Sequence, residues 1–198
     1  MTTRRQVMGA GLVLSVLPGL VEPRTWHAWP GPGVVPVERW LVDKRYPDAI
    51  AMSAHAMRDG ETVTAIERDV LGPWHDQLLP GIRDGELAAF GGVTDPTTLF
   101  LLQTLAADQR MHVAYRADHA WGGRGVMRHV LSGNAPTVSR IASAAGQDDW
   151  RLRFGQALRQ CHATGRPARR TVLTAADHCA SPGERLVSWI IVSRRSVA

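Results

Sequence analysis

Lysine and cysteine are scarce in this 198-residue chain. Lys44 is the only lysine among 23 basic residues, and Cys161 and Cys179 are the only cysteines. The excess of 23 basic over 18 acidic residues is therefore almost entirely arginine, and it falls by two when Arg4 and Arg5 are set aside. Two basic patches, one of Arg166, Arg169 and Arg170 and the other of Arg194 and Arg195, are not interleaved with aromatic residues that could stack on bases, so nucleic acid is a poor candidate partner.

Several motifs that carry specific chemistry are also absent. The sequence has no G-x-x-x-x-G-K-[ST] phosphate loop and no G-x-S-x-G elbow, which argues against a P-loop nucleotidase and an α/β-type serine hydrolase. The turn after the first expected strand, residues 43–46, lacks the glycines of a dinucleotide-binding fingerprint. Neither C-x-x-C-H nor H-E-x-x-H occurs. The sequence therefore names no cofactor and no metal.

The N-terminus has the layout of a secretory signal. Residues 1–6 contain two arginines and no acid, and an apolar run follows from Val7 to Val21. This run is shorter than the roughly 20 residues that a membrane-spanning helix needs. No permanent transmembrane helix is therefore expected here.

Within this layout, Thr3-Arg4-Arg5-Gln6-Val7-Met8 resembles the twin-arginine export signal, in which paired arginines precede a hydrophobic pair. Val7 stands where phenylalanine is commoner, and Gly9 stands where the pattern often has lysine. The resemblance covers residues 1–22 and implies export of the folded chain by the twin-arginine translocase to a bacterial periplasm. Residues 1–24 would then be the signal, although no clean A-x-A site marks the cut and an uncleaved signal could retain the protein. The alternative is a buried N-terminal helix with two chance arginines.

The two cysteines allow three interpretations. In an oxidising compartment Cys161 and Cys179 would form a disulfide. They could instead remain as free buried thiols. Each also has a histidine beside it, His162 and His178, so a metal site is a further alternative, but no C-x-x-C spacing supports it.

Strand and helix signals alternate along the first part of the mature chain. The pattern predicts a Rossmann-like, open, mostly parallel sheet of four to five strands, with helices on both faces. We expect residues 25–34 to form a Pro/Gly/Trp-rich linker and residues 35–198 to form one α/β domain. Its core would be residues 35–119, and residues 120–198 would be a helical extension that ends in an edge strand. The expected strands are Val35–Val42, Thr62–Ile66, Leu87–Val93, His112–Tyr115 and Leu186–Val192.

In open parallel sheets, ligands bind outside the carboxyl ends of the strands. This rule gathers acidic, basic and imidazole side chains at one edge. His119 or His75 would be the general base, because an imidazole titrates near neutral pH, and Asp43 or Asp69 would orient it.

Ligand-binding candidates lie at the same expected edge. Arg45 or Arg116 could hold a carboxylate or phosphate. Thr94 is followed by Asp95 and Pro96, which suit the N-cap and first position of a helix whose first N–H groups could bind an anion. Trp74 could stack on a flat ligand, or it could be an ordinary packing residue. A simpler interpretation of the whole pattern is that strands end in loops and that loops are polar.

Two classes of function follow, and the favoured one is an exported accessory protein that binds a small ligand or a partner protein. The alternative is a periplasmic hydrolase or lyase that uses His119 with an aspartate and an arginine. A subunit of an exported redox enzyme, carried out with its partner, is a third possibility.

Overall fold

The computed structural model describes residues 34–58, 62–121, 126–145, 150–162, 169–176 and 185–194. The expected export signal, nearly all of the expected linker and the expected Cys161–Cys179 bond lie outside these residues. In chain order the elements are β1 Val34–Pro36, β2 Arg39–Asp43, α1 Pro47–Arg58, β3 Thr62–Ile66, α2 Leu71–Pro73, a π-helical turn Trp74–Leu78, α3 Leu79–Asp84, β4 Ala89–Thr94, α4 Pro96–Asp108, β5 Met111–Trp121, β6 Val126–Gly133, α5 Ala135–Ala145, α6 Trp150–Leu158, β7 Gln160–His162, β8 Arg169–Ala176 and β9 Arg185–Ser193.

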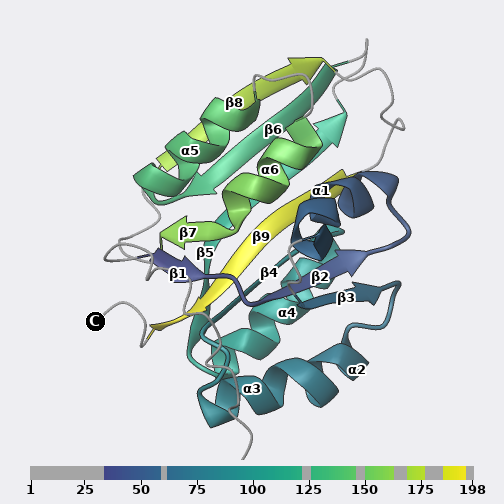
Figure 1. Ribbon diagram of the computed structural model, residues 1–198, viewed down its shortest axis with the longest axis vertical. Helices are drawn as coiled ribbons and strands as arrows, with labels where there is room; N and C mark the ends of the chain where they lie inside the picture. The colour runs from purple at the N-terminus through teal and green to yellow at the C-terminus, as the bar shows by residue number, and fades with distance from the viewer. Residues whose placement is uncertain are drawn as a thin grey trace, which may run out of the picture.

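A seven-stranded mixed sheet organises the described part of the chain (Figure 1). Its strand order is β3-β2-β4-β9-β5-β6-β8, and β1 pairs separately with β7. Strand β2 is parallel to β3 and β4, whereas the β4–β9, β5–β9, β5–β6 and β6–β8 pairs are antiparallel. The expected mostly parallel, Rossmann-like sheet is therefore wrong. Only the β3-β2-β4 part has the predicted parallel arrangement.

The expected extension contains helices α5 and α6, but strands β6 and β8 lie on either side of them in the chain, and their residue patterns explain why the sequence does not predict these strands. In β6 the buried set is Met127, His129, Leu131 and Gly133, and the other set is Val126, Arg128, Val130 and Ser132. Each set mixes apolar and polar residues, so the period-two signal of a half-buried strand is faint. Strand β8 has the same ambiguity.

Strand β9 lies at the centre of the sheet and not at its edge. It hydrogen-bonds to β4 on one side and β5 on the other, and Leu186 to Val192 are all buried. A continuous apolar run is typical of a strand that is covered on both faces. This run is correctly predicted as a strand, but its central position depends on pairing between distant segments.

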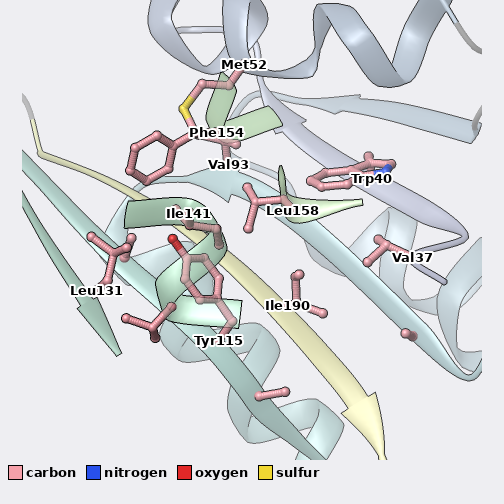
Figure 2. Packing of buried hydrophobic residues seen from close by; sticks show 14 of the residues in the cluster. Val37, Trp40, Met52, Val93, Tyr115, Leu131, Ile141, Phe154, Leu158 and Ile190 are labelled. Atoms are coloured by element: carbon pink, nitrogen blue, oxygen red, sulfur yellow. The ribbon is translucent and has the colours of Figure 1, made fainter. Parts of the chain in front are cut away.

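Two apolar cores flank the sheet. On one face, α1, α5 and α6 cover Trp40, Tyr115 and Ile190. Figure 2 shows Phe154 and Leu158 of α6 among these side chains. On the other face, α4 and the α2–α3 segment cover Leu41, Phe90 and Trp189, a second buried cluster. Among the described residues, no helix combines the length and apolar character that a membrane crossing needs.

Helices α1 and α6 approach each other closely at Gly155. A Cβ atom at this position would collide with the carbonyl oxygen of Met52 in α1. Only glycine fits here without moving one helix away from the other. The close approach seats Phe154 and Leu158, which are buried, against the sheet.

We predict that Gly155→Ala lowers the free energy of unfolding by about 1–3 kcal/mol, as overpacking commonly does. Helix propensity alone would give the opposite sign, because alanine is favoured over glycine by about 1 kcal/mol inside a helix. Chemical denaturation measures the difference. Gln156→Ala, in the same turn of α6, is the matched control and should change stability little. An alanine at 155 that stabilises the protein would contradict the close approach.

Candidate functional site

Four predicted or neighbouring polar residues do meet where β2 and β4 end. Asp43 is fully buried, and its carboxylate accepts hydrogen bonds from Arg45 Nε at 2.9 Å and Arg45 Nη2 at 2.5 Å. The same Nη2 donates to Asp95 Oδ2 at 2.8 Å. Thr94 Oγ1 donates to the Asp95 carbonyl and accepts from Trp189 Nε1, both at 3.1 Å. The strand-end cluster is therefore Asp43, Arg45, Thr94 and Asp95.

This cluster closes the start of α4. Asp95 Oδ1 accepts from the backbone N–H groups of Thr97 and Thr98 at 2.7 and 2.9 Å, which is an N-cap. Partial burial raises the pKa of Asp95, but the hydrogen bonds from Thr98 and Thr97 and the charge of Arg45 outweigh it, so the pKa is lowered. The hydrogen bond to Asp43 raises the pKa of Arg45 above its ordinary value. An incoming anion would have to displace a carboxylate that already occupies the helix terminus.

The other sequence-predicted residues make their contacts away from this cluster. Asp69 accepts from the N–H groups of Leu71 and Gly72 and so begins α2. Trp74 is buried and packs against Phe90, with 6.5 Å between the centroids of the two rings. His75 is exposed on the π-helical turn.

Arg116 and Asp118 pair with each other two strands from the cluster. Arg116 Nη2 lies 2.5 Å from Asp118 Oδ1, and both side chains are about two-fifths exposed, at 42% and 41%. Asp118 is in register with Val187 of β9, which is in register with Thr94 of β4. Strand β5 thus runs past the predicted strand end and carries Arg116 and Asp118 within the sheet.

His119 belongs to a buried chain of hydrogen bonds that the sequence did not reveal. It faces His129 directly across the β5–β6 pair, with 2.7 Å between the two Nδ1 atoms. Its Nε2 lies 2.8 Å from Ser188 Oγ of β9. All three residues are buried. We call this set the serine–histidine chain: Ser188, His119 and His129.

Aromatic rings of α6 seal the serine–histidine chain. Trp150 stacks on His119 with ring centroids 5.6 Å apart and an interplanar angle of 29°. Phe154 meets the rings of His119 and His129 edge-on or tilted, at 5.2 and 5.1 Å. The serine–histidine chain therefore lies between the sheet and α6, away from solvent.

Hydrogen bonding constrains the proton positions in this chain. Between two neutral imidazoles, one Nδ1 must carry the proton and the other must accept it. If His119 donates through Nδ1, its Nε2 accepts from the Ser188 hydroxyl, which is the order of a nucleophile, a base and an orienting group. With Ser188 and His119 covered, however, no substrate atom can reach the hydroxyl. In this arrangement the serine–histidine chain links strands β6, β5 and β9 by hydrogen bonds.

The buried imidazole links stability to pH. Burial, and secondarily the neighbouring His129, lowers the pKa of His119 well below its ordinary value. A histidine with a depressed folded-state pKa favours folding at pH values above its unfolded pKa of about 6.5, and this contribution is lost as the pH falls below that value. One such proton corresponds to a slope of up to about 1.4 kcal/mol per pH unit.

We predict that the free energy of unfolding is level above about pH 7 and decreases steadily toward pH 5. His119→Gln should be less stable than the parent at pH 7.5 but show a flatter pH dependence, because one titrating group is gone. His112→Gln is the control: burial also lowers the pKa of His112, but that side chain is only partly buried. Denaturation curves at each pH give the comparison. Equal slopes for the parent and His119→Gln would refute the assignment.

The sheet also has an uncovered half-face. On the α4 side, Leu41 of β2, Phe90 of β4 and Trp189 of β9 are buried. From Arg116 onward, none of the outward residues of β5, β6 and β8 whose burial the structure describes is buried. Helix α4 contacts β9 and β5, whereas α5 contacts β6 and β8 on the opposite side. We call this surface the open face, and its residues are Arg116, Asp118, Ala120, Arg128, Val130, Ser132, Arg170, Val172 and Thr174.

A shallow pocket lies near the opposite ends of the strands. Its volume is about 400 Å³, and Arg83, Asp108, Gln109 and Arg110 contribute to its lining, together with Ser193. None of the sequence-predicted site residues takes part in it. Within the described residues, no group of three or more histidine, cysteine, aspartate or glutamate side chains is placed to hold a metal ion.

Comparison with known proteins adds no family to this picture. No protein-family model, no curated protein and no solved structure matches this chain.

Proposed function

We propose that the chain is an exported protein that binds a partner protein, and that the open face is its binding surface. The observation that carries this proposal is the unequal covering of one sheet face. Helix α4 packs on β9 and on the first residues of β5, and no described segment covers β5, β6 and β8 from Arg116 onward. Val172, in the middle of the edge strand β8, is 50% exposed.

The surroundings of the open face support the same role. Helix α4 beside it has no charged residue from Pro96 to Ala107, and its Phe100 and Leu101 are 66% and 42% exposed. Exposed apolar side chains that lie close to one another mark interaction sites more often than scattered ones do. Phe100 and Leu101 are such neighbours on α4, and Val172 is a separate exposed apolar residue on β8.

The polar clusters favour binding over catalysis. The strand-end cluster directs its carboxylates to Arg45 and to the start of α4. The serine–histidine chain is closed by Trp150 and Phe154. A hydrolase that used His119 would first have to move α6, whereas binding at the open face needs no such step.

The exported location rests on the first residues, and replacement of both Arg4 and Arg5 by lysine tests it. We predict that this variant stays in the cytoplasm, because the twin-arginine pathway depends on the paired guanidinium groups. Cell fractionation followed by immunoblotting measures the distribution. Because lysine keeps the positive charge, a loss of export in this variant cannot result from a change in the charge of the N-terminal region. An unchanged periplasmic fraction would refute export by this route.

Site-specific photo-crosslinking tests the binding surface. A photoreactive amino acid at position 172 or 128, on the open face, should give one discrete crosslinked product in the cells that make the protein. The same amino acid at Asp76 or Glu86, both exposed elsewhere, should not. Val130→Asp should abolish the product, whereas Val130→Thr, which suits a strand, should keep it. Absence of a product at 172, or equal products at all four positions, would contradict the proposal.

A further inference from the structure

The geometry of the open face points to the kind of partner that would occupy it. We infer that it receives an amphipathic α-helix of a partner protein, laid beside α4, with an apolar centre bracketed by acidic side chains. This inference rests on the proposed binding function and specifies its chemistry.

The spacing of the sheet provides room for one helix. Neighbouring strands lie about 4.8 Å apart, and packed helices lie about 8–10 Å apart. Helix α4 contacts β9 and β5, so a helix packed beside it would lie two strands further, over β6 and β8. On the opposite side of the sheet this position is taken by α5, which contacts both strands (Figure 1). Over β6 and β8, the described segments therefore fill the helix position on the α5 side and leave the one on the open face empty.

The residues of the open face form three rows across β5, β6 and β8. The middle row is Asp118, Val130 and Val172, and it supplies the apolar centre. The rows on either side contain the arginines. One row is Ala120, Arg128 and Thr174, and the other is Arg116, Ser132 and Arg170.

The charges on this surface do not cancel. Asp118 pairs with Arg116. Arg128 and Arg170 are exposed, and within the described part of the chain neither has a carboxylate partner. The open face therefore carries a net positive charge around its valines, which favours acidic side chains on whatever covers it.

The row spacing sets where those acids should be. Arg128 and Arg170 lie two rows apart, or about 13 Å along the strands. A helix aligned with the strands rises 1.5 Å per residue, so acids seven or eight positions apart would span about 10–12 Å. The long arginine side chains can span the small difference between these two distances. Apolar residues at the third and fourth positions after the first acid would then lie over Val130 and Val172.

The acid requirement also separates a partner from the chain's own N-terminus. Residues 1–21 are apolar and basic and contain no acidic residue. They have the apolar surface that could cover valines, but they lack the carboxylates that Arg128 and Arg170 would attract. A separate chain with an acid-flanked helix fits both features.

Model peptides test the inference directly. One labelled helical peptide has glutamates seven residues apart around a leucine pair, a second has lysines in their place, and a third is a scramble of the first. Fluorescence anisotropy with the full chain should show at least tenfold tighter binding of the glutamate peptide than of either other peptide. The preference should weaken in high salt, because exposed charges are screened.

Charge reversal supplies the decisive variant. Arg128→Glu with Arg170→Glu should invert the preference toward the lysine peptide, and Val172→Asp should weaken binding of both. Arg68→Glu with Arg83→Glu makes the same change in net charge at exposed positions elsewhere and should leave the preference unchanged. Thermal unfolding confirms that each variant is folded.

The outcomes separate this inference from the binding function itself. If no peptide binds, or if the preference does not invert, while the crosslink from position 172 persists, then the helix chemistry is wrong and the binding surface stands. If both the peptides and the crosslink fail, both proposals fall. A monomer–dimer equilibrium lost in Val172→Asp, measured by sedimentation without peptide, would identify a second copy as the occupant and also overturn the inference.

Discussion

Strand β9 hydrogen-bonds to β4 on one side and to β5 on the other, and these two ladders hold the sheet together. Without them, β3-β2-β4 and β5-β6-β8 would be two separate three-stranded sheets. Because β9 is the last of the described strands, the fold pairs its end with β4 and β5 from the middle of the chain. Every described residue from Leu186 to Val192 is buried, so both cores depend on this strand.

Alternate side chains of β9 also connect the two polar clusters. Trp189 points to the α4 side, where its Nε1 donates to Thr94 and its ring meets Phe90 edge-on. Ser188 points to the α6 side, where its hydroxyl meets His119. A buried hydrogen bond contributes about 1 kcal/mol, but a buried polar group left without a partner costs about 1–3 kcal/mol. The register of β9 is therefore specified on both faces, since a slip by one residue would exchange Ser188 and Trp189.

The sequence predicts the part of this structure that depends on local signals. Asp95 followed by Pro96 predicts the start of α4, and the observed cap confirms it. The parallel β2–β3 pair and the convergence of Asp43 with Arg45 at the end of β2 also follow from strand–helix alternation. What local signals do not reveal is pairing. A strand such as β6, with apolar and polar residues on both sides, becomes recognisable only when β5 and β8 lie beside it.

The alternation of side chains along β5 explains why the predicted site residues of this strand lie on opposite faces of the sheet. The sequence places Arg116, Asp118 and His119 in one short segment, and a strand that ended before them would have gathered them in a loop. Because β5 continues to Trp121, successive side chains point to opposite faces. His119 is directed into the core under α6, and Arg116 and Asp118 are directed to the open face. The imidazole best suited to proton transfer is thus sealed, while the charged side chains of Arg116 and Asp118 remain partly exposed, and the proposed binding function rests on this division.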